Sequence, residues 1–400
     1  MYGKRTIAVI VAGFLTVFVA FAIRYGYGML LPEMLPALQI SKTEAGVIYS
    51  SYFITYTILA PVLGIMADRL DIRKILAVFV LILGIGAFLM TFSNSILTAS
   101  LFFGMAGIGM TACWTPLIPL VQRWVNDKRR GAALTIMDLG STLSIVAMSL
   151  VLPLIVGAFD WRKAWMFLGA AALLIAVVDY ILVRNRPGQQ SSAALTTTAQ
   201  SAPFKFDFKR LLRDSRFWLI GISYVFVGFT VIIAFTFLPT YGVQSLGMPY
   251  STAASVLAII AVTGVAGKLL LGPISDTWGR MKVMMLCCAL MAAGSLGMAL
   301  CGDFLGLGIA CGIYGIGYGA VWPVYAAVTG DYFPKDAIGR VMGLWTLLLG
   351  IGSISGPVVS GWSIDFTGGF FWAFMMSLAA ALLALLILVP MLKQKRKSAF

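Results

Sequence analysis

Histidine is absent from this chain of 400 residues, and charged residues make up only 11% of it. Without an imidazole, the chain lacks the side chain used most often for general acid–base catalysis and for binding transition metals. Hydrophobic residues reach 60% and the mean hydropathy is strongly positive, whereas about 25% of the residues of a soluble domain are charged. This composition predicts a protein that lies in a lipid bilayer and argues against a soluble enzyme.

Cysteine is also scarce. The five cysteines are Cys113, Cys287, Cys288, Cys301 and Cys311, and all of them lie within apolar segments. Their spacing does not match a metal site, and no phosphate-binding loop of the pattern GxxxxGK[ST] occurs. We therefore expect cysteines that serve in packing, with no metal, no cofactor, no enzymatic activity and no direct use of ATP.

Long apolar runs account for nearly the whole chain. A helix that crosses the bilayer needs about 20 predominantly apolar residues, and twelve segments of the sequence meet this requirement. They are residues 6–31, 46–66, 75–94, 98–121, 132–157, 163–183, 217–238, 251–272, 281–302, 304–328, 339–363 and 368–392. The expected fold class is an all-α membrane protein with twelve transmembrane helices.

The net charge of +14 reports membrane topology more simply than an affinity for nucleic acid. When the loops are assigned alternately to the two sides, all but five of the 29 basic residues fall on one side. Lys42, Arg162 and Lys163 fall on the other side, and Arg24 and Lys268 lie inside helices. Because positive charge marks cytoplasmic loops, both termini and the central loop are expected in the cytoplasm, with the chain in the cell inner (plasma) membrane.

The sequence contains an internal repeat with an offset of 208 residues. GMAGIGMTACW (104–114) aligns with GIYGIGYGAVW (312–322), and GIMADRLDIRKIL (64–76) aligns with GPISDTWGRMKVM (272–284) at the same offset. Two six-helix halves follow from it, which is a known arrangement of transporters. We expect an N-terminal bundle over residues 1–183, a polar cytoplasmic linker over 184–216 and a C-terminal bundle over 217–400.

The segment GIMADRLDIRK resembles the loop signature GxLaDrxGrkxxl of the major facilitator superfamily, and GPISDTWGRMK is its second copy. The first copy departs from the pattern at Asp71 and Ile72, where glycine is usual. The resemblance covers essentially the whole chain and implies two bundles that work by alternating access. It also implies gating roles for residues of the two signatures, which are Asp68, Arg69, Arg73, Asp276 and Arg280.

A narrower likeness concerns the segment VQRWVNDKRRGAALTIMDLGS (121–141), which is similar to the stretch before helix five of oxalate:formate antiporters and monocarboxylate transporters. Those families carry a basic residue in helix eight, at the position of Lys268, four residues before Gly272. The acidic residue that monocarboxylate transporters place four residues earlier is Gly264 here, and their acidic motif in helix one is missing. The likeness implies an organic-anion carrier and an anion-binding role for Lys268.

Three charges break the symmetry of the repeat. Lys268 aligns with Ala60, Arg24 with Ile232 and Asp138 with Thr346, so the scaffold itself does not require them. A charge near the bilayer centre costs roughly 2.5 to 3.5 kcal/mol and is expected to face a cavity, a partner or a substrate.

Each of these charges keeps a structural alternative. Lys268 can snorkel to the interface, Arg24 can lie in an interfacial aromatic belt beside Tyr25 and Tyr27, and Asp138 can be a structural partner of a cation. If Arg24 and Lys268 face inward, they can hold one anion from opposite halves. With no histidine, a transported proton needs a carboxylate such as Asp138 or Glu33, whereas Asp179 is expected to reach water at the cytoplasmic end of its helix.

Aromatic residues complete the predicted substrate site. Tyr314, Tyr318 and Trp322 recur at helical spacing in the glycine-rich tenth segment, and Trp114 lies in its counterpart. Together with the charges, the predicted substrate-binding residues are Lys268, Arg24, Tyr25, Tyr27, Trp114, Tyr314, Tyr318 and Trp322. Packing in the core is the alternative role for these rings.

The predicted function is secondary active transport of small organic anions, most simply proton-coupled symport of monocarboxylates by a monomer surrounded by lipid. A proton-coupled exporter of drugs or metabolites with the same fold is the alternative. Such exporters typically carry a GxxxGPxxGG-like run in helix five. Helix five of this chain reads GAALTIMDLGSTLSIVAMSLVLPLIV and lacks this run, which argues against the exporter. A membrane receptor or enzyme finds no support, because the sequence has neither a metal cluster nor a soluble sensor domain.

Overall fold

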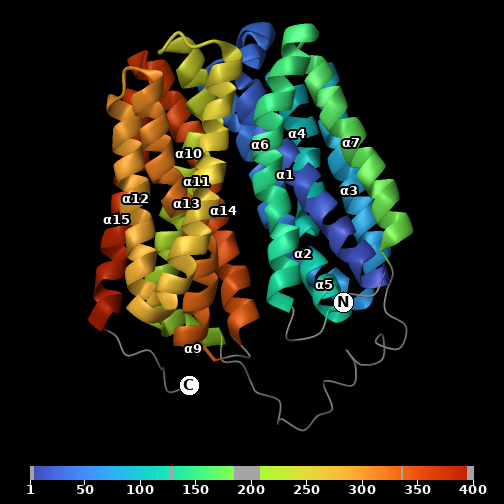
Figure 1. The fold of residues 1–400 in the computed structure, drawn as a ribbon, viewed down its shortest axis with the longest axis vertical. Helices are drawn as coiled ribbons and strands as arrows, with labels where there is room; N and C mark the ends of the chain where they lie inside the picture. Colours follow the sequence, from blue (N-terminus) through green and yellow to red (C-terminus); the bar gives the residue numbers. More distant parts are fainter. Residues whose placement is uncertain (1–3, 115, 126–129, 184–207, 335–336, 394–400) are drawn as a thin grey trace.

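The computed structural model describes residues 4–114, 116–125, 130–183, 208–334 and 337–393. Within these ranges, the side chains of residues 4, 64–69, 119, 122–123, 130, 208–210 and 393 are outside the description. The described chain is helical throughout, with no strand (Figure 1). The helices of the first half are α1 (Lys4–Leu38), α2 (Lys42–Arg69), α3 (Ile72–Leu89), α4 (Ile96–Met110), α5 (Leu117–Trp124), α6 (Arg130–Ala158) and α7 (Trp161–Leu182).

The second half begins with a short helix, α9 (Phe208–Arg213), inside the stretch expected to be linker, whose residues 184–207 lie outside the described ranges. It continues with α10 (Ser215–Gln244), α11 (Tyr250–Trp278), α12 (Arg280–Leu300), α13 (Phe304–Tyr332), α14 (Ile338–Thr367) and α15 (Phe371–Leu388). Short 3-10 turns η1 (Met90–Phe92), η2 (Thr111–Cys113) and η5 (Val389–Lys393) extend α3, α4 and α15.

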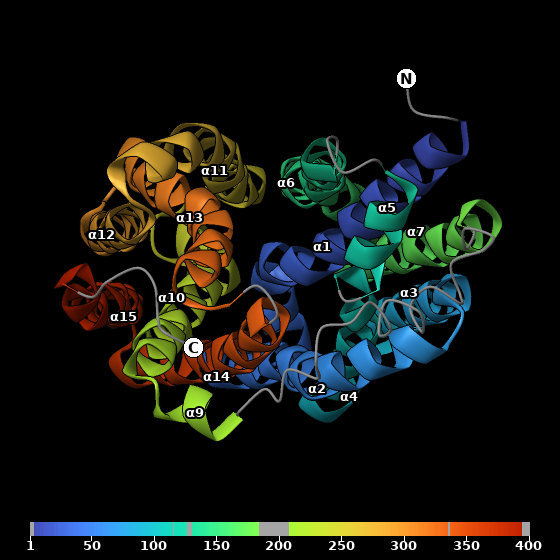
Figure 2. The ribbon, with the colours of Figure 1, turned by 90° about the horizontal axis from the view of Figure 1, so that it is seen from below.

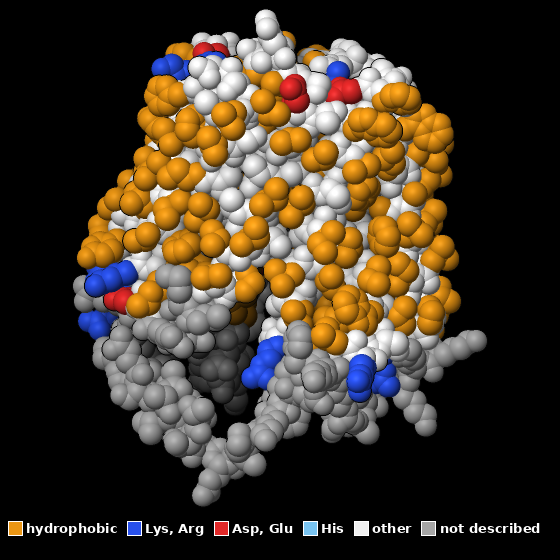
Figure 3. Space-filling model, turned by 180° about the vertical axis from the view of Figure 1, so that it is seen from behind, with side chains coloured by type: hydrophobic (Ala, Val, Ile, Leu, Met, Phe, Trp, Pro, Cys, Tyr) orange, Lys and Arg blue, Asp and Glu red, His pale blue; other side chains and the backbone are white. Residues whose placement is uncertain are grey.

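Twelve spans in the described residues are long and apolar enough to cross a membrane, which confirms the predicted fold class. On the face shown in Figure 3, hydrophobic side chains cover the middle of the molecule and charged side chains lie toward its two ends. Large apolar side chains such as Leu154 and Leu97 are mostly exposed. Side chains of this kind cover the face of a protein that lipid tails contact.

The fourth span is shorter than predicted. The sequence predicts one helix over 98–121, but α4 ends at Met110, passes through η2 and restarts as α5 at Leu117. Pro116 precedes the restart, and its ring removes a backbone donor and clashes with the preceding helical turn. The hydroxyl of Thr111 donates to the carbonyl of Ile108 at 2.7 Å where the helix ends.

The internal repeat is visible in how the helices approach each other. A Cβ added to Gly107 of α4 would lie 2.2 Å from the Tyr52 carbonyl oxygen, and one added to Gly315 of α13 would lie 2.6 Å from that of Ile260. Residues 52 and 260 are themselves 208 apart, the offset that relates Gly107 to Gly315. The glycines therefore allow the same close crossing of two backbones in both halves.

The two loop signatures turn differently. Gly279 begins α12 with φ of 106°, a backbone conformation that favours glycine. Its counterpart Asp71 has φ of −65° and caps α3 by accepting a hydrogen bond from the Arg73 amide at 2.9 Å. The departure from the family pattern at Asp71 thus exchanges a permissive glycine for a helix cap.

The helices form two groups, α1–α7 and α9–α15, that meet along three pairs of helices (Figure 2). These pairs are α1 with α10, α2 with α14, and α6 with α11. Both chain ends lie at one face of the molecule, which we call the termini face; the other is the opposite face (Figure 1).

The two groups pack closely toward the opposite face. A Cβ on Gly28 would lie 1.9 Å from the Phe235 carbonyl oxygen, and one on Gly46 would lie 2.4 Å from that of Pro357. At the termini face the surface is instead hollowed between the groups (Figure 3). The structure is therefore closed at the opposite face and open at the termini face.

Candidate functional site

Arg24 lies in α1 with only 9% of its surface exposed. Its guanidinium carbon stands 4.7 Å from the ring centroid of Phe53, 5.3 Å from that of Tyr25 and 5.6 Å from that of Phe21. The Nε–H has no hydrogen-bond partner, and no carboxylate of the described residues comes within ion-pair distance. Aromatic faces stabilise a cation but do not neutralise it, so Arg24 is a buried positive charge without a carboxylate partner in the described part of the chain.

Tyrosines of both halves surround this charge. Tyr49, Tyr52 and Tyr56 of α2 lie within electrostatic range of Arg24, and so do Tyr224 of α10 and Tyr318 of α13. The Tyr49 hydroxyl donates to the backbone carbonyl of Arg24 at 3.1 Å. The Arg24 environment is therefore shared between the two helix groups and is not internal to one of them.

Tyr25 connects the halves directly next to Arg24. Its hydroxyl shares a hydrogen bond of 3.0 Å with the hydroxyl of Tyr318. Its ring stands 4.2 Å from that of Phe235, which is 5.0 Å from the ring of Tyr318. The predicted substrate residues Arg24, Tyr25 and Tyr318 are thus brought together, and their rings join the two halves.

Trp114 and Trp322 extend this aromatic surface. Trp114 contacts Phe21 edge to face at 6.0 Å, and Trp322 contacts Tyr318 in the same way at 6.1 Å. Trp114, Tyr318 and Trp322 are all half-buried. They keep part of their surface accessible next to the charge.

Tyr27 and Tyr314 lie elsewhere. Tyr27 is fully buried, its hydroxyl donates to the carbonyl of Ala45 at 2.8 Å, and its ring stacks on Tyr49 at 5.0 Å. Tyr314 is fully buried against Gly294 of α12, and its hydroxyl has no partner. The structure places both inside their own helix groups, where packing is their evident role.

Lys268 and Asp138 form an ion pair across the two halves. The Lys268 Nζ of α11 lies 2.7 Å from the Asp138 Oδ2 of α6, with 27% and 37% of the two side chains exposed. The sequence left Asp138 with several candidate partners, and the packing of α6 against α11 selects Lys268.

Two other carboxylates are placed differently from Asp138. Glu33 is half-buried near the end of α1 at the opposite face, within electrostatic range of Tyr250, whose hydroxyl donates to the carbonyl of Met29 at 2.9 Å. Asp179 was expected to reach water, but this expectation is wrong, because its surface exposure is 0%. Its Oδ2 accepts a hydrogen bond from Thr16 at 2.7 Å and its Oδ1 has no partner, since α7 turns this side chain toward α1.

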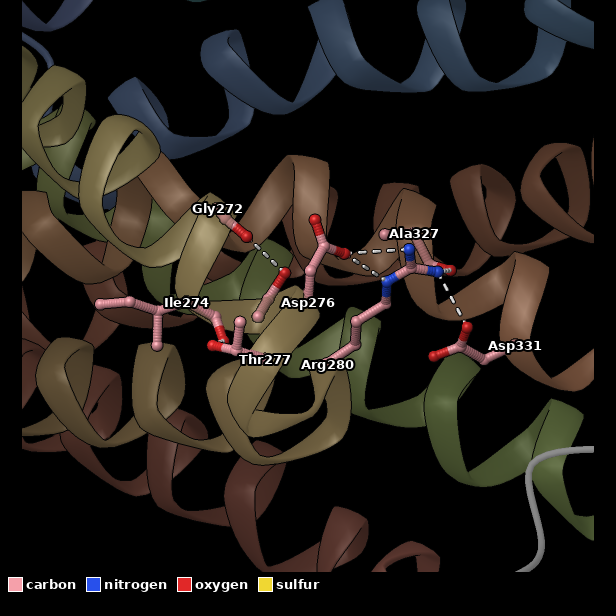
Figure 4. A network of polar contacts seen from close by, with 8 residues as sticks. Gly272, Ile274, Asp276, Thr277, Arg280, Ala327 and Asp331 are labelled. Carbon is pink, nitrogen blue, oxygen red and sulfur yellow. Dashed lines mark hydrogen bonds and ion pairs between the residues drawn. The ribbon is translucent and has the colours of Figure 1, made fainter.

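The second loop signature forms a polar network (Figure 4). Arg280 lies 3.1 Å from Asp276 and 2.8 Å from Asp331, and it also donates to the carbonyl of Ala327 at 3.0 Å. These contacts join the ends of α11 and α13 to the start of α12. They hold three helix ends of one half together at the termini face.

The first loop signature is only partly described. The side chains of Asp68 and Arg69 lie outside the described residues. Arg73 donates from Nε to the carbonyl of Tyr180 and stacks on its ring at 4.1 Å. In the described part, this signature therefore ties α3 to the end of α7.

Sequence reasoning missed a contact that closes the opposite face. Asp365 of α14 accepts hydrogen bonds from the amides of Lys42 and Thr43 at 3.1 and 2.8 Å, and from the Thr43 hydroxyl at 2.6 Å. We call this set of contacts the Asp365 clamp. The carboxylate of one half caps the first turn of α2 in the other half, where unpaired amides favour an anion.

A second hydrogen bond joins the same two helices, α2 and α14, farther from their ends at the opposite face. The Ser50 hydroxyl donates to the carbonyl of Ile354 at 2.6 Å, again from α2 to α14. An aspartate at the end of an apolar segment gives no sequence signal for a partner more than 300 residues away. The contact becomes visible only when the packing of α2 against α14 is known.

Curated relatives align along nearly the whole chain. The hexuronate transporter of Bacillus subtilis is 23% identical over 97% of this chain and 95% of its own length. The probable sulfoacetate transporter SauU of Cupriavidus necator is 24% identical, covering 94% of this chain and 92% of its own. Monocarboxylate transporter 12 of Xenopus laevis is 24% identical over 73% of this chain and 68% of its own.

Solved structures share the fold. A bacterial homolog of the human lysosomal transporter Spinster, in an inward-facing and unoccupied conformation, matches with a TM-score of 0.80 and 16% identity over the full length of both chains. The nucleoside transporter NupG matches with a TM-score of 0.77 and 16% identity, covering 98% of this chain and 100% of its own. The family model of the Major Facilitator Superfamily matches residues 13–320 and 267–399. With its twelve spans, two related halves and paired loop signatures, the chain belongs to the Major Facilitator Superfamily of membrane transporters.

Proposed function

We propose that this protein is a secondary active transporter of small organic anions, most simply of monocarboxylates together with a proton. The observation that carries the proposal is the buried guanidinium of Arg24, which has no carboxylate partner among the described residues. A charge inside the membrane is costly and faces a partner or a substrate. An anion is the substrate that compensates this charge.

The relatives support the class of substrate. The proteins that align over most of the chain are named as transporters of hexuronate, sulfoacetate and monocarboxylates. Each of these compounds carries a carboxylate, although their remaining groups differ. A planar guanidinium can donate two parallel hydrogen bonds to a carboxylate, and we assign this contact to Arg24.

The Lys268–Asp138 pair is our candidate for proton coupling. While Asp138 is ionised, its carboxylate forms an ion pair with the Lys268 ammonium, with the Oδ2 and Nζ atoms 2.7 Å apart. A proton on Asp138 removes the charge attraction and leaves Lys268 free to contact the anion from the opposite half. In this scheme proton binding and anion binding favour each other, which is the requirement for symport.

Alternating access requires the two halves to rock around the site. We place the termini face in the cytoplasm of a cell with this chain in its inner membrane, so that the structure represents an inward-open state. Breaking the Asp365 clamp and the Tyr25–Tyr318 hydrogen bond would then open the site to the outside. No cofactor takes part in this scheme.

Proteoliposomes test the proposal directly. Purified protein is reconstituted, and uptake of labelled lactate, pyruvate, acetate, benzoate, oxalate and a cationic dye is measured with and without an inward proton gradient. We expect saturable uptake of a carboxylate that the gradient stimulates. Saturable transport of the dye without uptake of any carboxylate would overturn the proposal.

Variants of the ion pair test the coupling separately. Asp138→Asn is expected to retain anion exchange while losing stimulation by the proton gradient, because the amide does not take up a proton. Lys268→Ala is expected to lower the apparent affinity for the anion. Uptake that survives Lys268→Ala unchanged would remove this lysine from the site.

A further inference from the structure

The accessible groups around Arg24 are mostly aromatic rings. Trp114, Tyr318 and Trp322 are half-buried, and Tyr56 of α2 is half-buried as well. Trp322 also contacts Tyr224 edge to face at 5.8 Å, so the rings continue from α13 to α10. The charge therefore lies beside ring surfaces contributed by both halves.

Groups that could bind the hydroxyls of a substrate are few in this region. Asparagine and glutamine occur in the described side chains only as Gln39, Asn94 and Gln244, all near helix ends at the opposite face. These amides are the groups that most readily donate to and accept from a polyol. None of these three described amides lies beside Arg24.

Tyrosine hydroxyls offer fewer bonds than amides, since each has one donor, and several of those near Arg24 are already bonded or buried. Those of Tyr25 and Tyr318 bond to each other at 3.0 Å. The hydroxyls of Tyr52 and Tyr314 have no partner, but both side chains are fully buried and out of reach of a ligand in the open site. Tyr56 and the Lys268–Asp138 pair are the polar groups left accessible to the hydroxyls of a sugar acid, and each of its buried hydroxyls that found no partner would cost binding energy.

Resting on the proposed function, we infer that the substrate is a carboxylate with a flat apolar body, an aromatic monocarboxylate such as benzoate or phenylacetate. Its carboxylate binds Arg24, and its ring packs against Trp114 on one side and against Tyr318 and Trp322 on the other. Aromatic pairs favour offset and edge-to-face contacts of the kind these residues already make with each other. Burial of the ring favours binding in the same way.

Competition for uptake tests this substrate class. Proteoliposomes take up labelled benzoate while unlabelled benzoate, phenylacetate, lactate, gluconate or glucuronate is added in increasing amounts. We expect half-inhibition by phenylacetate at a concentration roughly tenfold or more below that of glucuronate, because the polyol leaves hydrogen bonds unmade. Uptake of lactate or glucuronate in preference to benzoate would overturn the inference and leave the proposed function intact. If no carboxylate is taken up, the proposed function itself fails.

Variants separate ring contacts from charge contacts. Trp322→Leu is expected to weaken benzoate binding roughly tenfold while lactate uptake changes by less than about threefold, because lactate carries no ring. Trp322→Phe keeps a ring and is expected to retain most of the affinity, which controls for folding. Trp362→Leu is the matched control, since Trp362 is 55% exposed on α14 and stacks on Phe366. An equal loss of benzoate and lactate uptake in Trp322→Leu would contradict the assignment.

Discussion

Arg24 is a buried charge of the central region, and we propose that it selects the substrate. Arg24 is surrounded by aromatic rings that tolerate its charge without neutralising it. Its counterpart in the second half is Ile232, which is buried like the residues of an ordinary apolar core. At this position the two halves therefore carry different residues, although they share the same arrangement of helices.

Arg24→Gln is expected to reduce anion uptake by roughly two orders of magnitude, because truncating one partner of a desolvated charge pair removes a large share of the binding energy. Arg24→Lys keeps the positive charge but loses the planar guanidinium, so its uptake rate is expected to lie between those of the native protein and of Arg24→Gln. The measurement is the rate of anion uptake by each variant in proteoliposomes. Gel filtration of the detergent-solubilised variants is the control for folding. A glutamine variant within threefold of the native protein would remove Arg24 from the site.

Asp179 is a residue for which we expect a structural effect. Its only described hydrogen bond comes from Thr16 at 2.7 Å, and Asp179→Asn keeps an acceptor for this hydroxyl without a buried carboxyl group. We expect the thermal stability in detergent to be retained in Asp179→Asn, whereas Thr16→Val lowers the free energy of unfolding by about 1–3 kcal/mol. In an Asp179→Leu background the threonine change should have little further effect. Loss of transport by a stable asparagine variant would instead show a functional role.

At the scale of helices, the closed face depends on how α14 meets α2. The Asp365 clamp joins a carboxylate to the first turn of a helix in the other half. By contrast, Asp160 and Asp303 cap the helices α7 and α13 that directly follow them, through the amides of Lys163 and Gly306 at 2.8 Å each. Of these three aspartates, only Asp365 bonds to the other half and has to release its partners when the halves separate at this face.

Asp365→Ala is therefore expected to shift the protein toward a state open at the opposite face by about tenfold, because three hydrogen bonds across the halves are lost. The readout is labelling of Ser50→Cys, a buried position of α2, by a membrane-impermeant thiol reagent in a Cys301→Ser background. Asp160→Ala serves as the matched control, and its labelling rate should stay unchanged. Equal labelling in the Asp365 and Asp160 variants would rule out the clamp as a closing contact.

Sequence reasoning succeeded for elements and failed for contacts between them. The period and length of the apolar runs predicted the twelve spans, but not the break before Pro116, because Pro153 and Pro323 lie inside continuous helices. The repeat identified Arg24, Lys268 and Asp138 as charges that the scaffold does not need. It could not show that Lys268 meets Asp138, because which helices face each other depends on the packing of whole bundles.

At the scale of the whole molecule, the structure corresponds to one end of the rocking motion that we propose. Among the described residues, the Asp365 clamp, the Ser50–Ile354 bond and the close approaches of Gly28 and Gly46 join the halves toward the opposite face, and the Lys268–Asp138 pair joins α6 to α11. A transporter held in this state can exchange substrate with one side only.

A cross-link at the clamp should therefore stop transport. Thr43→Cys combined with Asp365→Cys places two thiols where the native oxygens are 2.6 Å apart. We expect oxidation, or a short thiol cross-linker, to abolish net uptake and a reducing agent to restore it. Each single variant treated in the same way is the control. Full transport by a quantitatively cross-linked protein would show that this face does not need to open.

The charge balance of the site has an electrical consequence. With Lys268 paired to Asp138, the empty site carries one net positive charge from Arg24. After one proton and one monovalent anion bind, the sum is still one. Membrane voltage contributes about 2.3 kcal/mol per elementary charge per 100 mV, but it acts equally on the loaded and the empty carrier as they cross in opposite directions. A potential imposed with a potassium ionophore should therefore leave the final ratio of internal to external anion concentration unchanged. In the proposed cycle, the pH gradient alone would drive accumulation of the anion in a cell.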